Sequence, residues 1–138
     1  MPSPRNRAFL AIAVPLAAVA LFAGGFYADT KYEEADLKAR AEAMTGGNAD
    51  RGLQAIGRYG CGGCHTLMGV PGAHGTVGPP LDGVGARAII GGRLENRPDN
   101  LMLWIQHPQK VSPGTAMPEL GVTPADSRDM AAFLYTRT

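Results

Sequence analysis

The chain has 138 residues, of which 45% are hydrophobic, and this length leaves room for one globular domain and little more. Its 13 Lys and Arg nearly balance its 12 Asp and Glu, so it lacks the strongly basic surface of nucleic-acid-binding proteins, and we expect no nucleic-acid partner. Its two cysteines, Cys61 and Cys64, exclude a disulfide framework beyond one bond between them.

The N-terminal segment is apolar. Arg5 and Arg7 precede residues 8–27, which carry no charge and are numerous enough to cross a bilayer as a helix. We therefore predict a transmembrane anchor at residues 1–28. The alternative is a signal peptide, either uncleaved or cut after Gly25. Both interpretations send the rest of the chain out of the cytoplasm, because positive flanks stay inside.

Residues 29–48 are predicted to connect this anchor to a folded domain. Residues 29–44 are rich in Ala, Glu, Lys and Arg, a composition typical of an exposed helix that would act as a stalk. A disordered polar linker is the alternative. Thr45-Gly46-Gly47-Asn48 interrupts the pattern and places the start of the globular domain, residues 49–138, at Ala49.

The motif Cys61-Gly62-Gly63-Cys64-His65 has the spacing of a c-type haem attachment site. In a helical turn, Cys61, Cys64 and His65 share one face, so both thiols can form thioethers with one haem while His65 binds its iron. A thioredoxin-type redox pair would need a surrounding βαβ pattern, which the sequence lacks. A zinc site would need a fourth ligand, for which the isolated His74 and His107 are poor candidates.

Short helices are predicted around this motif. Asp50 is expected to cap a helix that ends at Tyr59, Pro98 to begin a second that ends before Pro108, and Thr123 to cap a third. Glycines and prolines dominate residues 60–92, where we expect no regular structure, and no segment shows a strand pattern. The predicted fold is all-α, with three to four short helices around a haem that completes a thin core.

Met117 is the candidate for the sixth iron ligand. It lies between Pro113 and Pro118, which restrict the loop and lower the entropy lost when a weak thioether ligand is held in place. The other internal methionines have simpler structural explanations as packing or stalk residues: Met44, Met68, Met102 and Met130.

Together with the haem motif, Gly78-Pro79-Pro80-Leu81, Gly85-Ala86-Arg87 and the segment 113–118 resemble class I mono-haem cytochrome c over residues 49–138. The resemblance implies that the Pro79 carbonyl accepts a hydrogen bond from the His65 ring and that Leu81 packs on the haem. It also implies that Arg87 pairs with a haem propionate and that Trp104 lies beside the haem. A solvated surface cation is the alternative for Arg87, and core packing alone is the alternative for Trp104.

Within this family, the chain is most similar to anchored cytochrome c subunits or domains of haem-copper oxidase systems. Residues 49–138 contain eight Lys and Arg against seven Asp and Glu, so long-range electrostatic steering would be weak, and a membrane tether would compensate for it. We expect an electron carrier, not an enzyme, that passes single electrons from a donor complex to a terminal oxidase. Its expected location is the bacterial inner membrane, with the haem domain facing the periplasm.

Two other functions fit the same sequence. A five-coordinate haem, with Met117 only packing, would indicate an enzyme or gas sensor. A haem that relays electrons inside a larger respiratory complex would make the chain a structural subunit of that complex.

Overall fold

The computed structural model describes the backbone of residues 4–138 and the side chains of residues 15–138. Of the predicted anchor at residues 1–28, residues 1–3 and the side chains of residues 4–14 therefore lie outside the described part. Within that part, no helix combines the length and the hydropathy that membrane crossing requires. The chain divides into two compact units, Met1–Asp36 and Leu37–Thr138.

Helix α1 (Pro4–Thr45) is continuous and contains Pro15. It includes residues 29–44, so the helix predicted there is confirmed and the alternative of a disordered linker is wrong. The helix ends where predicted, because Gly46 has a φ of 67°, a left-handed conformation that glycine adopts without a steric penalty.

The last turns of α1 belong to the unit Leu37–Thr138. Ala41 is only 1% exposed. A carboxylate oxygen of Glu42 accepts hydrogen bonds from the backbone N–H of Ala49 at 2.9 Å and from the side chain of Asn48 at 3.1 Å. The compact unit therefore begins before Ala49, because the end of α1 packs on the domain.

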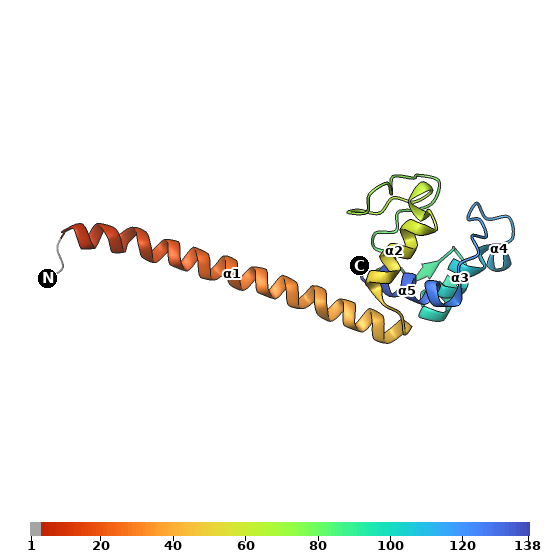
Figure 1. Ribbon diagram of the computed structural model, residues 1–138, viewed down its shortest axis with the longest axis horizontal. Helices are drawn as coiled ribbons and strands as arrows, with labels where there is room; N and C mark the ends of the chain where they lie inside the picture. Colours follow the sequence, from red (N-terminus) through yellow and green to blue (C-terminus); the bar gives the residue numbers. More distant parts are fainter. Residues whose placement is uncertain (1–3) are drawn as a thin grey trace. The chain divides into compact units, whose positions relative to one another are not determined.

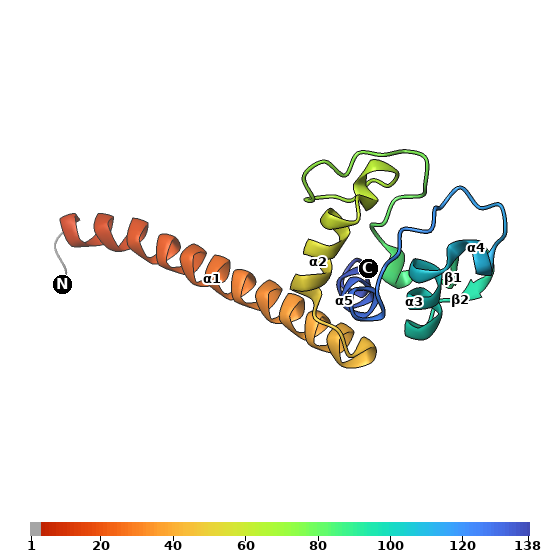
Figure 2. The same cartoon turned by 45° about the vertical axis from the view of Figure 1, so that its right-hand side comes forward.

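Helices α2 (Ala49–Arg58) and α5 (Pro124–Tyr135) form the centre of this unit and lie side by side in both ribbon views (Figures 1 and 2). At Gly52, a Cβ atom would lie 1.9 Å from the carbonyl oxygen of Asp129 and 2.9 Å from Cβ of Phe133. Phe133 therefore packs directly against Gly52, and this helix contact requires a residue without a side chain.

The N-terminal capping residue predicted from the sequence is correct for one of these two helices. Thr123 caps α5 as predicted, because its hydroxyl accepts a hydrogen bond from the N–H of Asp126 at 3.1 Å. The cap predicted at Asp50 is wrong. Asn48 caps α2 by accepting from the N–H of Arg51 at 3.0 Å, and Asp50 lies in the first turn, where its carboxylate pairs with Lys38.

The remaining elements are short. They are the 3₁₀ turns η1 (Cys61–Gly63) and η2 (Val84–Ala86), strands β1 (Ile89–Ile90) and β2 (Leu94–Glu95), and helices α3 (Pro98–Gln106) and α4 (Pro108–Val111). Pro98 begins α3 as predicted. The mostly helical fold is confirmed, and Pro108 begins a further short helix instead of only ending α3.

The expectation that the chain has no strand is wrong at one place. Strands β1 and β2 pair antiparallel, with Ile89 opposite Glu95 and Ile90 opposite Leu94. Gly91 and Gly92 have φ values of 56° and 69°, which let the chain reverse between two strands too short to show a periodic pattern.

Two long loops lie on the same side of the helices, one between η1 and η2 and the other between α4 and α5 (Figures 1 and 2). The first loop follows the haem-attachment motif and the second contains Met117. The fold thereby brings these distant parts of the sequence to one region.

Candidate functional site

A cavity of about 470 Å³ lies within the unit Leu37–Thr138, a volume typical of pockets that bury a cofactor-sized ligand. Helices α2, α3 and α5 and the two long loops contribute to its wall. All the site residues predicted from the sequence line it: Cys61, Cys64, His65, Pro79, Leu81, Arg87, Trp104 and Met117.

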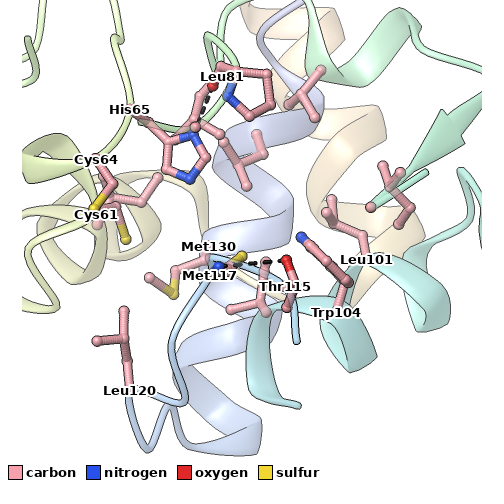
Figure 3. Close-up of a pocket in the computed structure, with 18 of the residues that line it drawn as sticks. Cys61, Cys64, His65, Leu81, Leu101, Trp104, Thr115, Met117, Leu120 and Met130 are labelled. Atoms are coloured by element: carbon pink, nitrogen blue, oxygen red, sulfur yellow. Dashed lines mark hydrogen bonds between the residues drawn. The ribbon is translucent and has the colours of Figure 1, made fainter. Parts of the chain in front are cut away.

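The attachment motif forms one tight turn at the edge of this cavity. Gly60 has a φ of 71° and separates α2 from η1. The backbone N–H groups of Cys64 and His65 both donate to the carbonyl of Cys61, at 3.2 and 3.0 Å. The turn therefore places both thiols and the imidazole along one wall (Figure 3). Both cysteines are half-buried, and burial raises the pKa of the Cys61 thiol.

The imidazole of His65 is oriented by a hydrogen bond to the backbone of the following loop. Its Nδ1 lies 2.6 Å from the carbonyl oxygen of Pro79, which can only accept a hydrogen bond, so Nδ1 carries the proton. In the neutral ring, Nε2 is then the nitrogen that can bind a metal, and it faces the cavity (Figure 3). A metal-bound histidine commonly has this arrangement, in which the second ring nitrogen fixes the tautomer and the ring orientation.

Met117 reaches the cavity from the loop after α4 and lies across it from His65 (Figure 3). Its backbone N–H is 3.4 Å from the hydroxyl of Thr115, which also lines the cavity. Met130, on α5, is a second methionine at the cavity wall and is 2% exposed. The structure thus offers two thioethers, one on a loop and one on a buried helix.

Arg87 and Trp104 also line the cavity, and Trp104 lies on the opposite side of it from the cysteines (Figure 3). The guanidinium of Arg87 donates to the carbonyl oxygens of Pro80 and Asp82, the latter at 3.2 Å. Its remaining N–H groups are available to a ligand in the cavity. Trp104 is half-buried with its indole nitrogen toward the cavity, and its ring lies so close to Gly91 that a Cβ there would be 2.6 Å away.

Sequence reasoning missed most of the apolar wall. Buried side chains from α2, η2, β1, α3, α5 and the loop before α5 complete it: Ile56, Val84, Ile90, Leu101, Ile105, Val122, Met130 and Leu134. Helical periodicity identifies such residues as buried, but it does not separate those that face a cofactor from those that face another helix. His74 and His107, which the sequence made poor candidates for metal ligands, are both exposed and do not line the cavity.

These residues fit haem c. The wall is mainly apolar, which suits a porphyrin ring, and Arg87 supplies a cation for a carboxylate. Two thiols, an imidazole and a thioether are the protein groups that attach a c-type haem and bind its iron.

Comparison with known proteins agrees with this assignment. The family model for cytochrome c matches residues 49–138. The chain is also 37% identical over 82 residues to cytochrome c oxidase subunit 2 of Alkalihalophilus pseudofirmus. That match covers 59% of this chain and 23% of the relative, so the chain corresponds to less than a quarter of the relative's length. No solved structure matches the chain.

The CxxCH turn, the cavity behind it and the family match over residues 49–138 lead to one assignment. Haem c is covalently bound through Cys61 and Cys64, and the domain transfers electrons instead of transforming a substrate. The chain belongs to the cytochrome c family.

Proposed function

We propose that this cytochrome is a membrane-tethered carrier of single electrons whose haem iron is bound by His65 and Met117, and that it delivers electrons to a terminal oxidase. The observation that carries the proposal is the position of these two side chains on facing walls of one apolar cavity (Figure 3). Haem iron supplies the redox chemistry, because it exchanges one electron between its ferric and ferrous states.

The protein's part is to keep that iron in one environment. The hydrogen bond from His65 to Pro79 fixes the imidazole, and the loop fixes Met117, so neither ligand has to move when the charge changes. The soft thioether favours the ferrous state and raises the reduction potential. The apolar wall limits access of water, which keeps the reorganisation on electron transfer small.

Methionine ligation separates this carrier from a five-coordinate enzyme or gas sensor. In the oxidised protein we expect the near-infrared sulfur-to-iron absorption band, and in the reduced protein we expect slow or no binding of carbon monoxide. Met117→Leu should remove the band and admit carbon monoxide while leaving the haem attached. A wild-type protein that lacks the band, or that binds carbon monoxide readily, would contradict the proposal.

Met130 provides the matched control, because it is the other methionine at the cavity. Met130→Leu exchanges side chains of similar volume at a buried helical position and should retain the band. If Met130→Leu loses the band and Met117→Leu keeps it, the sixth ligand comes from α5 and not from the loop.

An oxidase partner and a membrane tether are supported by different observations. The relative at 37% identity is an oxidase subunit, which favours an oxidase as acceptor and a respiratory complex as donor. The apolar segment at residues 8–27, preceded by Arg5 and Arg7, favours anchoring in the bacterial inner membrane with the haem domain in the periplasm.

The tether can be tested by truncation to the compact unit that begins at Leu37. The truncated chain should keep its haem spectrum but should reduce the oxidase in membranes only at much higher concentration, because tethering raises the effective concentration to about the millimolar range. Equal activity of the two forms at low concentration would contradict a functional tether. The intact mass of protein extracted from membranes tests the same proposal, because it reports whether the N-terminus is retained.

A relay subunit of a larger complex remains the second candidate, because the relative contains the matching segment within a much longer chain. Purification in mild detergent separates the two. A free carrier should elute alone, whereas a relay subunit should co-purify with the oxidase in a fixed ratio.

A further inference from the structure

We infer that Gln109 is the positioning residue of the methionine ligand: its side-chain amide fixes the backbone of the loop that holds Met117 toward the iron. The inference deepens the proposed function and rests on Met117 as the sixth ligand. Gln109 lies in α4, immediately before this loop, and no part of it lines the haem cavity. Any effect it has on the haem is therefore exerted through the loop.

The Gln109 side chain contacts the loop at three points. Its Nε2 donates to the carbonyl oxygens of Thr115 and Met117, each at 2.7 Å. Its Oε1 accepts from the backbone N–H of Gly114 at 3.2 Å. Two of these contacts lie on the carbonyls either side of Ala116, so the amide determines the path of the chain into and out of Met117.

Only a side-chain amide satisfies this set of partners. The two carbonyls can only accept and the Gly114 N–H can only donate, so the orientation of the amide follows from its neighbours. Glutamate would place an acceptor against two acceptors, and lysine would leave the Gly114 N–H without a partner. Gln109 uses both of its donor hydrogens and its oxygen here.

Glu119 holds the other end of the loop. Its carboxylate accepts from the backbone N–H of Gln109 at 3.2 Å and lies 3.6 Å from Nδ1 of His107. The loop is therefore attached to α4 both before and after Met117. Movement of the Met117 backbone away from the cavity would require breaking contacts of Gln109.

This arrangement determines how often Met117 leaves the sixth coordination position of the iron open to another ligand. A competing ligand such as imidazole binds ferric haem only in molecules whose methionine has moved away, so its apparent affinity reports the fraction that is open. Each hydrogen bond of Gln109 opposes opening. Its loss should raise the open fraction without changing the attachment of the haem.

The test compares Gln109→Ala and the isosteric Gln109→Glu with Gln106→Ala in the full chain carrying its haem. Gln106 is a matched control on α3 and is half-buried like Gln109. It donates to Ser127 at 2.9 Å and to Met102 at 3.2 Å, and both partners lie in helices outside the loop that holds Met117. The measurements are the imidazole dissociation constant of the ferric protein, the near-infrared band and the denaturant midpoint.

We expect imidazole to bind about tenfold to a hundredfold more tightly to both Gln109 variants, because two or three hydrogen bonds that hold the loop are lost. The imidazole dissociation constant of Gln106→Ala should stay within about twofold of the wild-type value, even if its denaturant midpoint falls as far as those of the Gln109 variants. Gln109→Glu keeps the volume of the side chain, so an effect shared with Gln109→Ala cannot come from a cavity.

Two results would overturn the inference, and they differ from failure of the proposed function. If wild type shows the near-infrared band and the Gln109 variants bind imidazole no more tightly than Gln106→Ala, Gln109 does not position Met117. If all three variants tighten binding in proportion to their lost stability, the effect is global unfolding. If wild type itself lacks the band, Met117 is not the ligand and both proposals fall together.

Discussion

The backbone of Gly78 lies directly against the imidazole of His65. A Cβ atom on Gly78 would be 2.3 Å from Cε1 and 2.6 Å from Nδ1 of the ring, distances that real Cβ contacts do not reach. The next residue, Pro79, supplies the carbonyl that accepts the Nδ1 hydrogen bond. The same short segment thus supports the ring by contact and orients it by hydrogen bonding.

We therefore expect Gly78→Ala to displace the His65 ring and to break its hydrogen bond to Pro79. The loss of such a contact weakens metal ligation about tenfold to a hundredfold. The expected result is a mixture of spin states in the oxidised protein, measured by electron paramagnetic resonance, with the haem still covalently attached. Gly63→Ala is the control, since a Cβ there meets nothing within 4 Å. A single unchanged low-spin species in Gly78→Ala would contradict the prediction.

Arg87 offers a test of charge at the cavity. Removal of a nearby cation disfavours the reduced iron, which has the smaller positive charge, so Arg87→Gln should lower the reduction potential by about tens of millivolts. Arg87→Lys keeps the charge and should stay close to wild type, although it loses the planar group that donates to Pro80 and Asp82. Redox titration measures both. Equal potentials in wild type and Arg87→Gln would favour the alternative of a solvated surface cation.

The elements that sequence predicted well depend on local signals. Pro98 and Thr123-Pro124 mark helix starts through the geometry of the first turn, and the CxxCH spacing defines its own turn. These features need only neighbours within a few residues. The motif spacing identified Cys61, Cys64 and His65, and the neighbouring prolines identified Met117. The other four site residues, Pro79, Leu81, Arg87 and Trp104, came from the resemblance to class I cytochrome c, and all eight line one cavity.

The parts that sequence did not predict depend on tertiary contacts. The end of α1 packs on the domain through Ala41 and Glu42, which look like ordinary exposed residues of a helix. The role of Gln109 depends on where the loop returns, and no pattern in the sequence gives that return path. The cap of α2 is Asn48 and not Asp50, and the Asn48 side chain also donates a hydrogen bond to Glu42 near the end of α1.

The contact between α2 and α5 predicts that alanine substitutions at two glycines of α2 have opposite effects on the free energy of unfolding. Gly52→Ala would place a Cβ 1.9 Å from the Asp129 carbonyl oxygen, so the helices must move apart at a cost of about 1–3 kcal/mol in unfolding free energy. Gly57→Ala meets nothing within 4 Å and should stabilise the protein by about 0.5–1 kcal/mol. Denaturant unfolding of the two variants measures the difference. Similar midpoints would mean that the helix contact tolerates a side chain.

Asp129 connects α5 to the start of α2 and makes stability depend on acid. Its carboxylate accepts from Arg51 at 2.6 and 2.9 Å and from the N–H of Asn48 at 2.7 Å. The hydrogen bond from Arg51, followed by that from Asn48, lowers the pKa of Asp129, although burial opposes the shift. Because the carboxylate binds a proton less readily in the folded protein, its stabilising effect is complete above the unfolded pKa, about 3.9. The effect is lost as the pH falls through the folded pKa.

Asp129→Asn should therefore lower the free energy of unfolding at pH 7 and flatten its decline at acidic pH. The slope should not vanish, because two other carboxyl groups also have lowered pKa values. Hydrogen bonds from the N–H of Met68 and from Arg137 lower the pKa of Asp82, and hydrogen bonds from Tyr59 and Thr123 lower that of Asp126. Asp50→Asn is the control, because this side chain is 73% exposed and its pairing with Lys38 contributes little. Denaturant unfolding between pH 3 and pH 7 measures the slopes. If Asp129→Asn and wild type lose stability in parallel as the pH falls, Asp129 is not a source of the acid sensitivity.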